Sequence, residues 1–81
     1  MEIKISRHAR RRMQLYKIDE DDVRLIVKSA KMDKGLQAGK HEEITHDLKD
    51  KYRYPLKVVF VIEEERIEVV TAYPLKKERA R

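Results

Sequence analysis

Two segments near the end of the chain, residues 56–62 and 66–73, constrain the fold more than any other feature of the sequence. Both are rich in β-branched residues, and three glutamates at positions 63–65 separate them, a pattern typical of a β-hairpin. A two-residue turn at Glu64 and Glu65 would place Ile62 opposite Ile67. Because glutamate disfavours the positive φ of a tight hairpin turn, a three-residue loop is the alternative, and it would change the register.

The two-residue turn predicts which side chains share a face of this hairpin. The core face would carry a mostly apolar set, namely Leu56, Val58, Phe60, Ile62, Ile67, Val69, Thr71 and Tyr73. The opposite face would carry a more polar set, namely Lys57, Val59, Val61, Arg66, Glu68, Val70 and Ala72. In this pairing Lys57 and Thr71 lie on opposite faces of the sheet.

The first half of the chain is predicted to form two amphipathic helices, at residues 7–16 and 20–31. Ser6 suits the N-cap position of the first helix and Asp19 that of the second, whose next three residues are acidic and complement the helix dipole. Each helix has an apolar face: Ala9, Met13 and Tyr16 in the first, and Val23, Ile26, Val27 and Ala30 in the second.

Shorter signals complete the predicted outline. Alternating apolar residues at positions 1, 3 and 5 predict a short strand, residues 31–40 contain both glycines and predict a loop, and part of 41–48 predicts a strand. We therefore expect an α+β fold, with two N-terminal helices packed on an antiparallel sheet. It would form a single domain at residues 1–75, followed by a basic C-terminal tail at residues 76–81.

The composition limits what the chain can be. Its 81 residues suffice for one hydrophobic core, and the absence of cysteine excludes disulfides and thiolate metal sites. The longest apolar run, residues 58–62, is far shorter than the ~18 residues of a membrane span, and the N-terminus lacks a signal-peptide pattern. We expect a cytoplasmic protein with no membrane partner. Charged residues make up 43% of the chain against two glycines and two prolines, which is compatible with a thermophilic source.

The net charge of +5 lies in the first half of the chain. Residues 1–40 contain eleven Lys/Arg against six Asp/Glu, whereas residues 41–81 contain nine of each, and residues 7–17 contain five basic residues and no acidic one. This favours an anionic partner, and RNA is our prediction. Arg7, Arg10, Arg11 and Lys17 would contact phosphates, and Tyr54, with Tyr52, would stack on unpaired bases. The alternatives are a solvated helix face and a tyrosine at a strand edge.

The three histidines are candidates for metal ligands or for a catalytic base, and their positions favour different roles. His41 and His46 are five residues apart, whereas the zinc-protease motif needs a spacing of four, so we expect no metal or other cofactor. His8 lies in the first turn of the first helix, near Arg11 and Arg12 and at the rim of the apolar face. Beside these cations it could act as a neutral base. The alternative is a histidine packed between helix and sheet with both nitrogens bonded.

Two motifs resemble those of a small family of domains of unknown function. The N-terminal motif is Ser6-x-His8-Ala9-x-x-Arg12-Met13, then Ile18 before an acidic cap and Val23; the closing motif is Val69-Val70-Thr71-Ala72-Tyr73-Pro74. The similarity covers nearly the whole chain, and the family is grouped with RelE/barnase/colicin-like ribonuclease toxins and ParE-type relatives. The resemblance therefore implies a RelE-like helix pair on an antiparallel sheet and, in some relatives, metal-independent RNA cleavage.

The resemblance also implies site residues. His8 matches the family's helix histidine, Arg12 its helix arginine, and Thr71 and Tyr73 its last strand. The chain departs from the family at positions 16 and 17, where Tyr and Lys stand in place of an expected arginine and glycine.

Together these patterns predict a RelE-like RNA-binding domain, and more specifically an endoribonuclease toxin with an acidic antitoxin protein as partner. Cleavage would proceed by attack of a ribose 2′-hydroxyl on the adjacent phosphate. His8 would serve as base or acid, and Thr71 or Tyr73 would position the substrate. Arg12 would stabilise the phosphate together with Lys57, which is assigned from its chemistry alone.

The alternative is a non-catalytic module that binds a protein or a nucleic acid. It would dock a partner's helix or strand on the half-apolar face formed by Val59, Val61, Val70 and Ala72.

Overall fold

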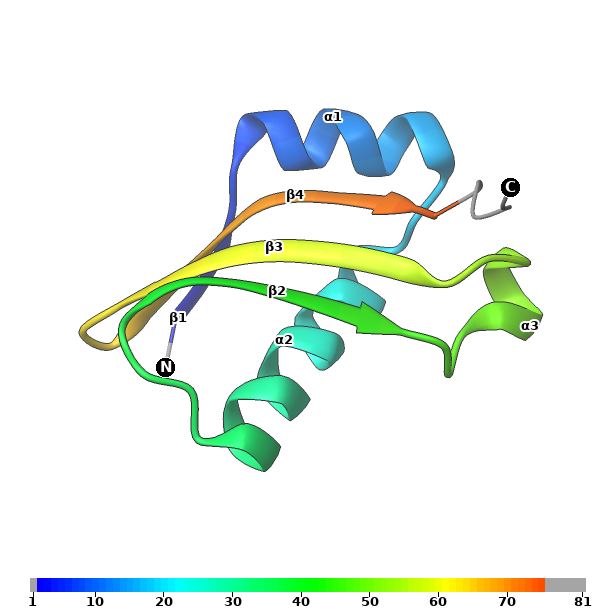
Figure 1. The fold of residues 1–81 in the computed structure, drawn as a ribbon. Helices are drawn as coiled ribbons and strands as arrows, with labels where there is room; N and C mark the ends of the chain where they lie inside the picture. Colours follow the sequence, from blue (N-terminus) through cyan, green and yellow to red (C-terminus); the bar gives the residue numbers. More distant parts are fainter. Residues whose placement is uncertain (1, 76–81) are drawn as a thin grey trace.

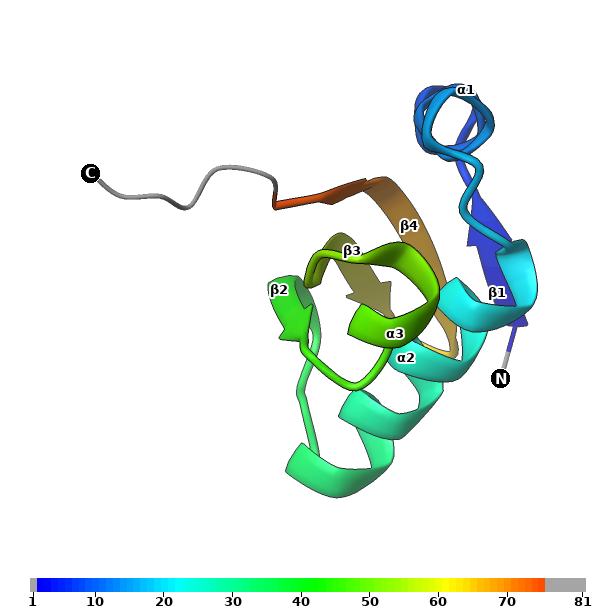
Figure 2. The same ribbon diagram turned by 90° about the vertical axis from the view of Figure 1, so that its right-hand side faces the viewer.

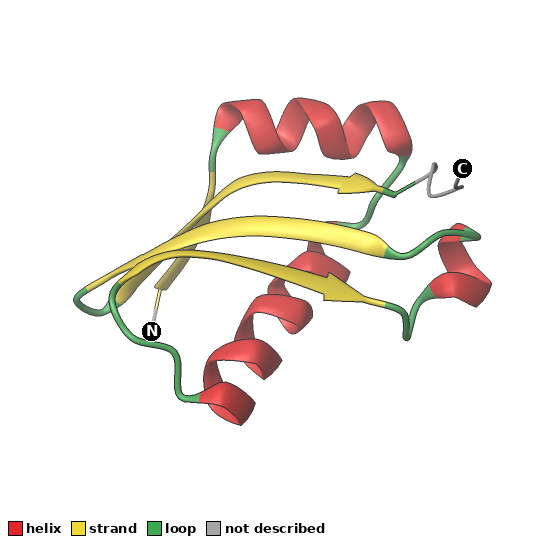
Figure 3. Ribbon diagram, viewed as in Figure 1, coloured by secondary structure: helices red, strands yellow, loops and turns green. Residues whose placement is uncertain are grey.

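The computed structural model of the protein describes residues 2–75 and contains four strands and three helices (Figure 1 and Figure 3). In chain order they are β1 (Glu2–Ile5), α1 (Arg7–Tyr16), α2 (Glu20–Lys34), β2 (Gly39–Thr45), α3 (Lys49–Tyr52), β3 (Leu56–Glu63) and β4 (Arg66–Pro74). The predicted basic tail, residues 76–81, lies outside the described residues.

The four strands form one mixed sheet in the order β1-β4-β3-β2. β3 pairs antiparallel with both β2 and β4, whereas β1 pairs parallel with β4, with Ile3 opposite Ile67 and Ile5 opposite Val69. The parallel pairing is possible because three helices and two strands separate β1 from β4 along the chain, far more than the short turn of a hairpin. The expected α+β fold is confirmed, with a sheet that is antiparallel except at β1.

The two main helices begin where their capping residues predict. The hydroxyl of Ser6 accepts a hydrogen bond from the N–H of Ala9, at 3.0 Å, and so caps α1. α1 ends at Lys17, which adopts a left-handed φ of 57°. α2 follows Asp19, whose carboxylate makes no capping hydrogen bond and instead accepts one from Lys51, at 2.7 Å.

The second helix and the segments after it depart from the sequence prediction. α2 continues to Lys34, beyond the predicted end at residue 31, and stops at Gly35, which adopts a left-handed φ of 57°. The expected loop is therefore short, and β2 begins at Gly39. The single-turn helix α3 was not predicted.

The core lies between α2 and one face of the sheet, and α1 closes it along β4. Figure 1 and Figure 2 both show α1 and α2 on different sides of β4. α1 lies along the part of β4 that continues beyond β1, and the predicted apolar residues Ala9 and Met13 are buried there. The largest fully buried side chains come from both helices and both central strands: Phe60, Met13, Leu56, Ile67, Val23, Val27, Val58 and Val69.

The tip of the β3–β4 hairpin has the predicted register, with Ile62 opposite Ile67. Glu64 adopts a φ of 51° at the turn, although glutamate disfavours this conformation.

A β-bulge then shifts the register of β4. Phe60 pairs with Val69, whereas its neighbour Val59 pairs with Thr71. Val70 is therefore the extra residue on β4, and it is 36% exposed.

The bulge overturns the predicted faces of the end of β4. Ala72 is fully buried and belongs to the core, so it is not part of an exposed apolar face as expected. Thr71 and Tyr73 lie on the sheet face turned away from α2, together with Lys57. We call this face of β3 and β4 the outer face.

Candidate nucleic-acid interface

Three polar residues predicted for the site meet on the outer face. Lys57 on β3 pairs with Tyr73 on β4, and Val59 pairs with Thr71. Because side chains two residues apart on a strand share a face, Lys57, Thr71 and Tyr73 lie together. The expectation that Lys57 and Thr71 lie on opposite sides of the sheet is therefore wrong, and the bulge is the reason.

α1 adds a row of three residues at the edge of this face. His8, Arg12 and Tyr16 are spaced by four residues and so succeed one another along one side of the helix. The guanidinium carbon of Arg12 lies 5.3 Å from the ring centre of Tyr73 and 6.0 Å from that of Tyr16. These distances are in the range of cation–π contacts, so the two rings hold the guanidinium against the outer face.

The charge of Arg12 is not neutralised within the described chain. None of the carboxylates in residues 2–75 forms an ion pair with it. The Nε atom of Arg12 and the Oγ1 atom of Thr71 are both buried and have no hydrogen-bond partner within that range. Buried polar atoms without a partner are unusual, and one of these two belongs to the guanidinium that the aromatic rings hold.

Lys57 is held by a carboxylate that the sequence did not reveal as part of the site. Its Nζ lies 3.1 Å from the carboxylate of Glu42 on β2. The hydrogen bond from Lys57 to Glu42 raises the pKa of Lys57 above its usual value, and the nearby Tyr73 hydroxyl adds to this effect. Lys57 is therefore charged at neutral pH, and Glu42 balances part of its charge. Because Glu42 and Lys57 are far apart in the sequence, no local sequence pattern indicated this contact.

Two members of the predicted basic run lie away from this site. Arg10 forms an ion pair with Glu20 of α2, so it lies on the flank of α1 that faces α2. Lys17 ends α1 as its left-handed cap.

The other predicted contact residues lie near the site or apart from it. Arg7 and Arg11 are exposed, one turn apart on α1. His8 is exposed and makes no hydrogen bond or ion pair to another described residue. Tyr54 is half-buried just before β3 and interacts with other parts of the chain.

The remaining histidines, His41 and His46, lie in different surroundings. The Nε2 atom of His41 lies 2.7 Å from the carbonyl oxygen of Gln37, and its ring lies 5.7 Å from that of Phe60. His46 is exposed after the end of β2. Between residues 2 and 75, groups of three or more His, Asp or Glu side chains that could hold a metal ion are absent. In the same range, every helix is too short or too polar to cross a membrane.

Comparison with known proteins identifies one family. The model of a domain of unknown function, DUF4258, matches residues 5–74 of the chain. Searches of curated proteins and of solved structures found no match.

Proposed function

This chain belongs to the DUF4258 family, and we propose that it is an RNA-binding domain that holds phosphate groups on its outer face. The observation that carries the proposal is the bulge in β4. It brings Thr71 and Tyr73 to the same face as Lys57, with Tyr73 under the guanidinium of Arg12.

The chemistry of these residues suits RNA. A planar guanidinium can donate two parallel hydrogen bonds to a phosphate, and a lysine adds a point charge. Arg12 is the better candidate for the primary contact, since the described carboxylates leave it unneutralised, whereas Lys57 must first leave Glu42. The exposed Arg7 and Arg11 extend the positive charge along α1.

We further propose that the site cleaves RNA by transesterification, as a RelE-like toxin would. The 2′-oxygen of a ribose would attack the adjacent phosphorus and form a 2′,3′-cyclic phosphate, while the bond to the 5′-oxygen breaks. His8 would take the proton of the 2′-hydroxyl or supply one to the leaving oxygen. Arg12 and Lys57 would stabilise the charge that develops on the phosphate, and Thr71 or Tyr73 would position it. An acidic antitoxin would act by covering these cations.

One observation favours RNA binding without cleavage. No described residue orients the ring of His8, whereas a general base is usually held by a hydrogen bond to a third group. The experiments below separate the two functions.

The binding test compares two arginines of the same helix. Anisotropy of a labelled single-stranded RNA is measured at several salt concentrations for the wild type, Arg12→Gln and Arg10→Gln. Each lost phosphate contact should lower the log–log salt slope by about 0.7. We expect this loss for Arg12→Gln and little change for Arg10→Gln, whose side chain is engaged by Glu20. Equal losses in both variants would place the RNA elsewhere on α1.

The cleavage test uses purified protein, total RNA and EDTA. If His8 is the base or acid, His8→Ala should reduce cleavage by about 10²–10⁴-fold, while His46→Ala, the matched exposed histidine, should not. Circular dichroism checks that both variants remain folded. Activity that survives in folded His8→Ala would remove His8 from the mechanism, and activity only with added Mg²⁺ would reject metal-independent chemistry. Binding without cleavage under every condition would establish the non-catalytic alternative.

A further inference from the structure

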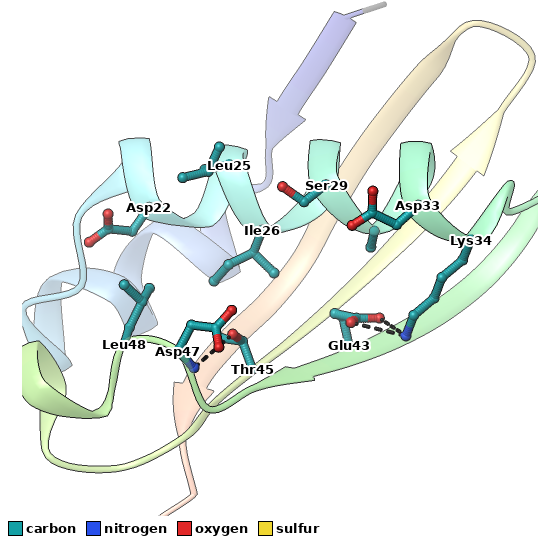
Figure 4. A pocket seen from close by; sticks show the side chains of 11 residues that line it. Asp22, Leu25, Ile26, Ser29, Asp33, Lys34, Glu43, Thr45, Asp47 and Leu48 are labelled. Atoms are coloured by element: carbon teal, nitrogen blue, oxygen red, sulfur yellow. Dashed lines mark hydrogen bonds and ion pairs between the residues drawn. The ribbon is translucent and has the colours of Figure 1, made fainter.

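A concave surface lies between α2 and β2, on the opposite side of the sheet from the outer face (Figure 4). Its volume is about 210 Å³. Hydrogen bonds from two residues of α2, Lys34 and Asp22, hold the helix to the elements on the other side of the groove. Lys34 of α2 reaches Glu43 of β2 at 2.9 Å, and Asp22 of α2 accepts hydrogen bonds from Lys51 and Tyr52 of α3, at 2.8 and 2.5 Å. The groove is therefore preformed, and a ligand would not have to order it.

The centre of the groove is apolar. Figure 4 shows Ile26 pointing from α2 into the space between the helix and β2, with Leu25 above it and Leu48 at one end. Leu25 is 62% exposed, so its side chain is accessible to a ligand that binds in the groove. A ligand that covers Leu25 would bury this apolar area and gain affinity.

The rim of the groove is acidic, although the whole chain carries a charge of +5. It contains four carboxylates and a single lysine, Lys34, which already bonds Glu43. Asp22 bonds Lys51 and Tyr52. The carboxylates of Asp33 and Asp47 form no ion pair within residues 2–75. Figure 4 shows these two on opposite walls, Asp33 on α2 and Asp47 after β2.

We propose that this groove binds an exposed basic segment of a partner protein, in which one aliphatic side chain is flanked by lysine or arginine. A groove of about 210 Å³ can take one such side chain, while the stems of its neighbours lie along the rim. The flanking cations would meet Asp33 and Asp47, and the aliphatic group would cover Ile26 and Leu25. The same carboxylates repel nucleic acid, so this partner differs from the RNA proposed for the outer face.

The test maps binding of a defined peptide on the full ¹⁵N-labelled chain by NMR. The probe is the blocked hexapeptide Gly-Arg-Leu-Lys-Arg-Gly. Two control peptides replace its leucine by serine or its three basic residues by glutamate. We expect saturable amide shifts at groove residues such as Ser29 and Asp33. Loss of the leucine anchor should weaken binding by at least about tenfold, and the acidic peptide should not bind.

Three variants locate the contact. Asp33→Asn and Asp47→Asn should each weaken binding by about two- to fivefold, the usual range for partly exposed ion pairs. Asp21→Asn makes the same change of charge on exposed α2 surface outside the groove and should have no effect. Leu25→Ser should weaken binding while leaving the fold intact, since its side chain is already exposed.

Several results would overturn the proposal. These are no saturable shift, shifts centred on α1 or the outer face, and equal affinity for the serine peptide. Amide shifts that change on dilution without peptide would instead assign the groove to a second copy of the chain. None of these outcomes bears on the RNA tests, because the two surfaces share no residue.

Discussion

Deletion of Val70 should leave the protein folded, although it shortens the strand that carries half of the candidate site. The residues on either side, Val69 and Thr71, pair with consecutive residues of β3, namely Phe60 and Val59. Removing the extra residue therefore turns a bulged strand into a regular one and keeps every remaining pair.

The cost of this deletion can be worked from the contacts of Val70. Its carbonyl accepts a hydrogen bond from the hydroxyl of Ser6 at 3.2 Å, an exposed contact worth about 0.5–1.5 kcal/mol. Its side chain is 36% exposed, so the lost burial adds about 1 kcal/mol. The sum, about 1.5–2.5 kcal/mol, is less than the roughly 4–12 kcal/mol expected for the unfolding of an 81-residue domain.

The assay is urea unfolding followed by circular dichroism, with two aspartate variants as controls for the faces of β4. Ala72→Asp should cost about 3–5 kcal/mol, because Ala72 is fully buried and the new charge would have no partner. Thr71→Asp should cost less, since Thr71 is only half-buried and shares the outer face with Lys57. A strand without the bulge would reverse this order. That reversal, or a deletion variant without a cooperative transition, would refute the reasoning.

Three further predictions concern stability. Lys17→Gly should raise the free energy of unfolding by about 0.5–1 kcal/mol, measured by thermal unfolding, because Lys17 has a left-handed φ of 57° that only glycine adopts freely. Tyr52→Phe should lower it by about 1–3 kcal/mol in urea, since its hydroxyl donates to Asp22 at 2.5 Å and accepts from the N–H of Asp19 at 3.0 Å; no loss would mean that water replaces both bonds. The hydrogen bond from Lys51, followed in size by that from Tyr52, holds the pKa of Asp22 below its ordinary value of 3.8. The charged carboxylate therefore stabilises the fold fully above pH 3.8, and this contribution is lost as the pH falls through the lower pKa of the folded state. Urea unfolding from pH 6 to pH 2 should therefore show a larger loss for the wild type than for Asp22→Asn.

Local signals in the sequence predicted the helices and the hairpin well. Ser6 caps α1 by the expected hydrogen bond, and the apolar periodicity of α2 matches its buried residues. These features depend on neighbours within a few residues, so a single sequence reveals them. The strand partner of residues 2–5 could not be predicted, because the pairing with β4 spans over 60 positions of the chain.

The site was predicted less well than the fold because its geometry depends on one inserted residue. Val69, Val70 and Thr71 all favour strands equally, and no glycine marks the bulge. A strictly alternating pattern therefore assigned Thr71 to the core face. Likewise, the basic run gave no sign that Arg10 would bond Glu20 while Arg12 would remain without a carboxylate partner. The sequence showed which residue types were present. The side of the sheet or helix on which each one lies depends on contacts between segments far apart in the chain.

The pairing of the first strand with the last has a consequence for synthesis on the ribosome. β1 and α1 leave the exit tunnel before β4, but the surface that they complete belongs to β4. Until then β1 lacks its neighbouring strand and α1 lacks the strand along which it lies, so the nascent chain cannot assemble the outer face. Arg12 meets Tyr73 only after β4 has been made. A domain of this topology therefore completes its outer face only after translation has passed β4.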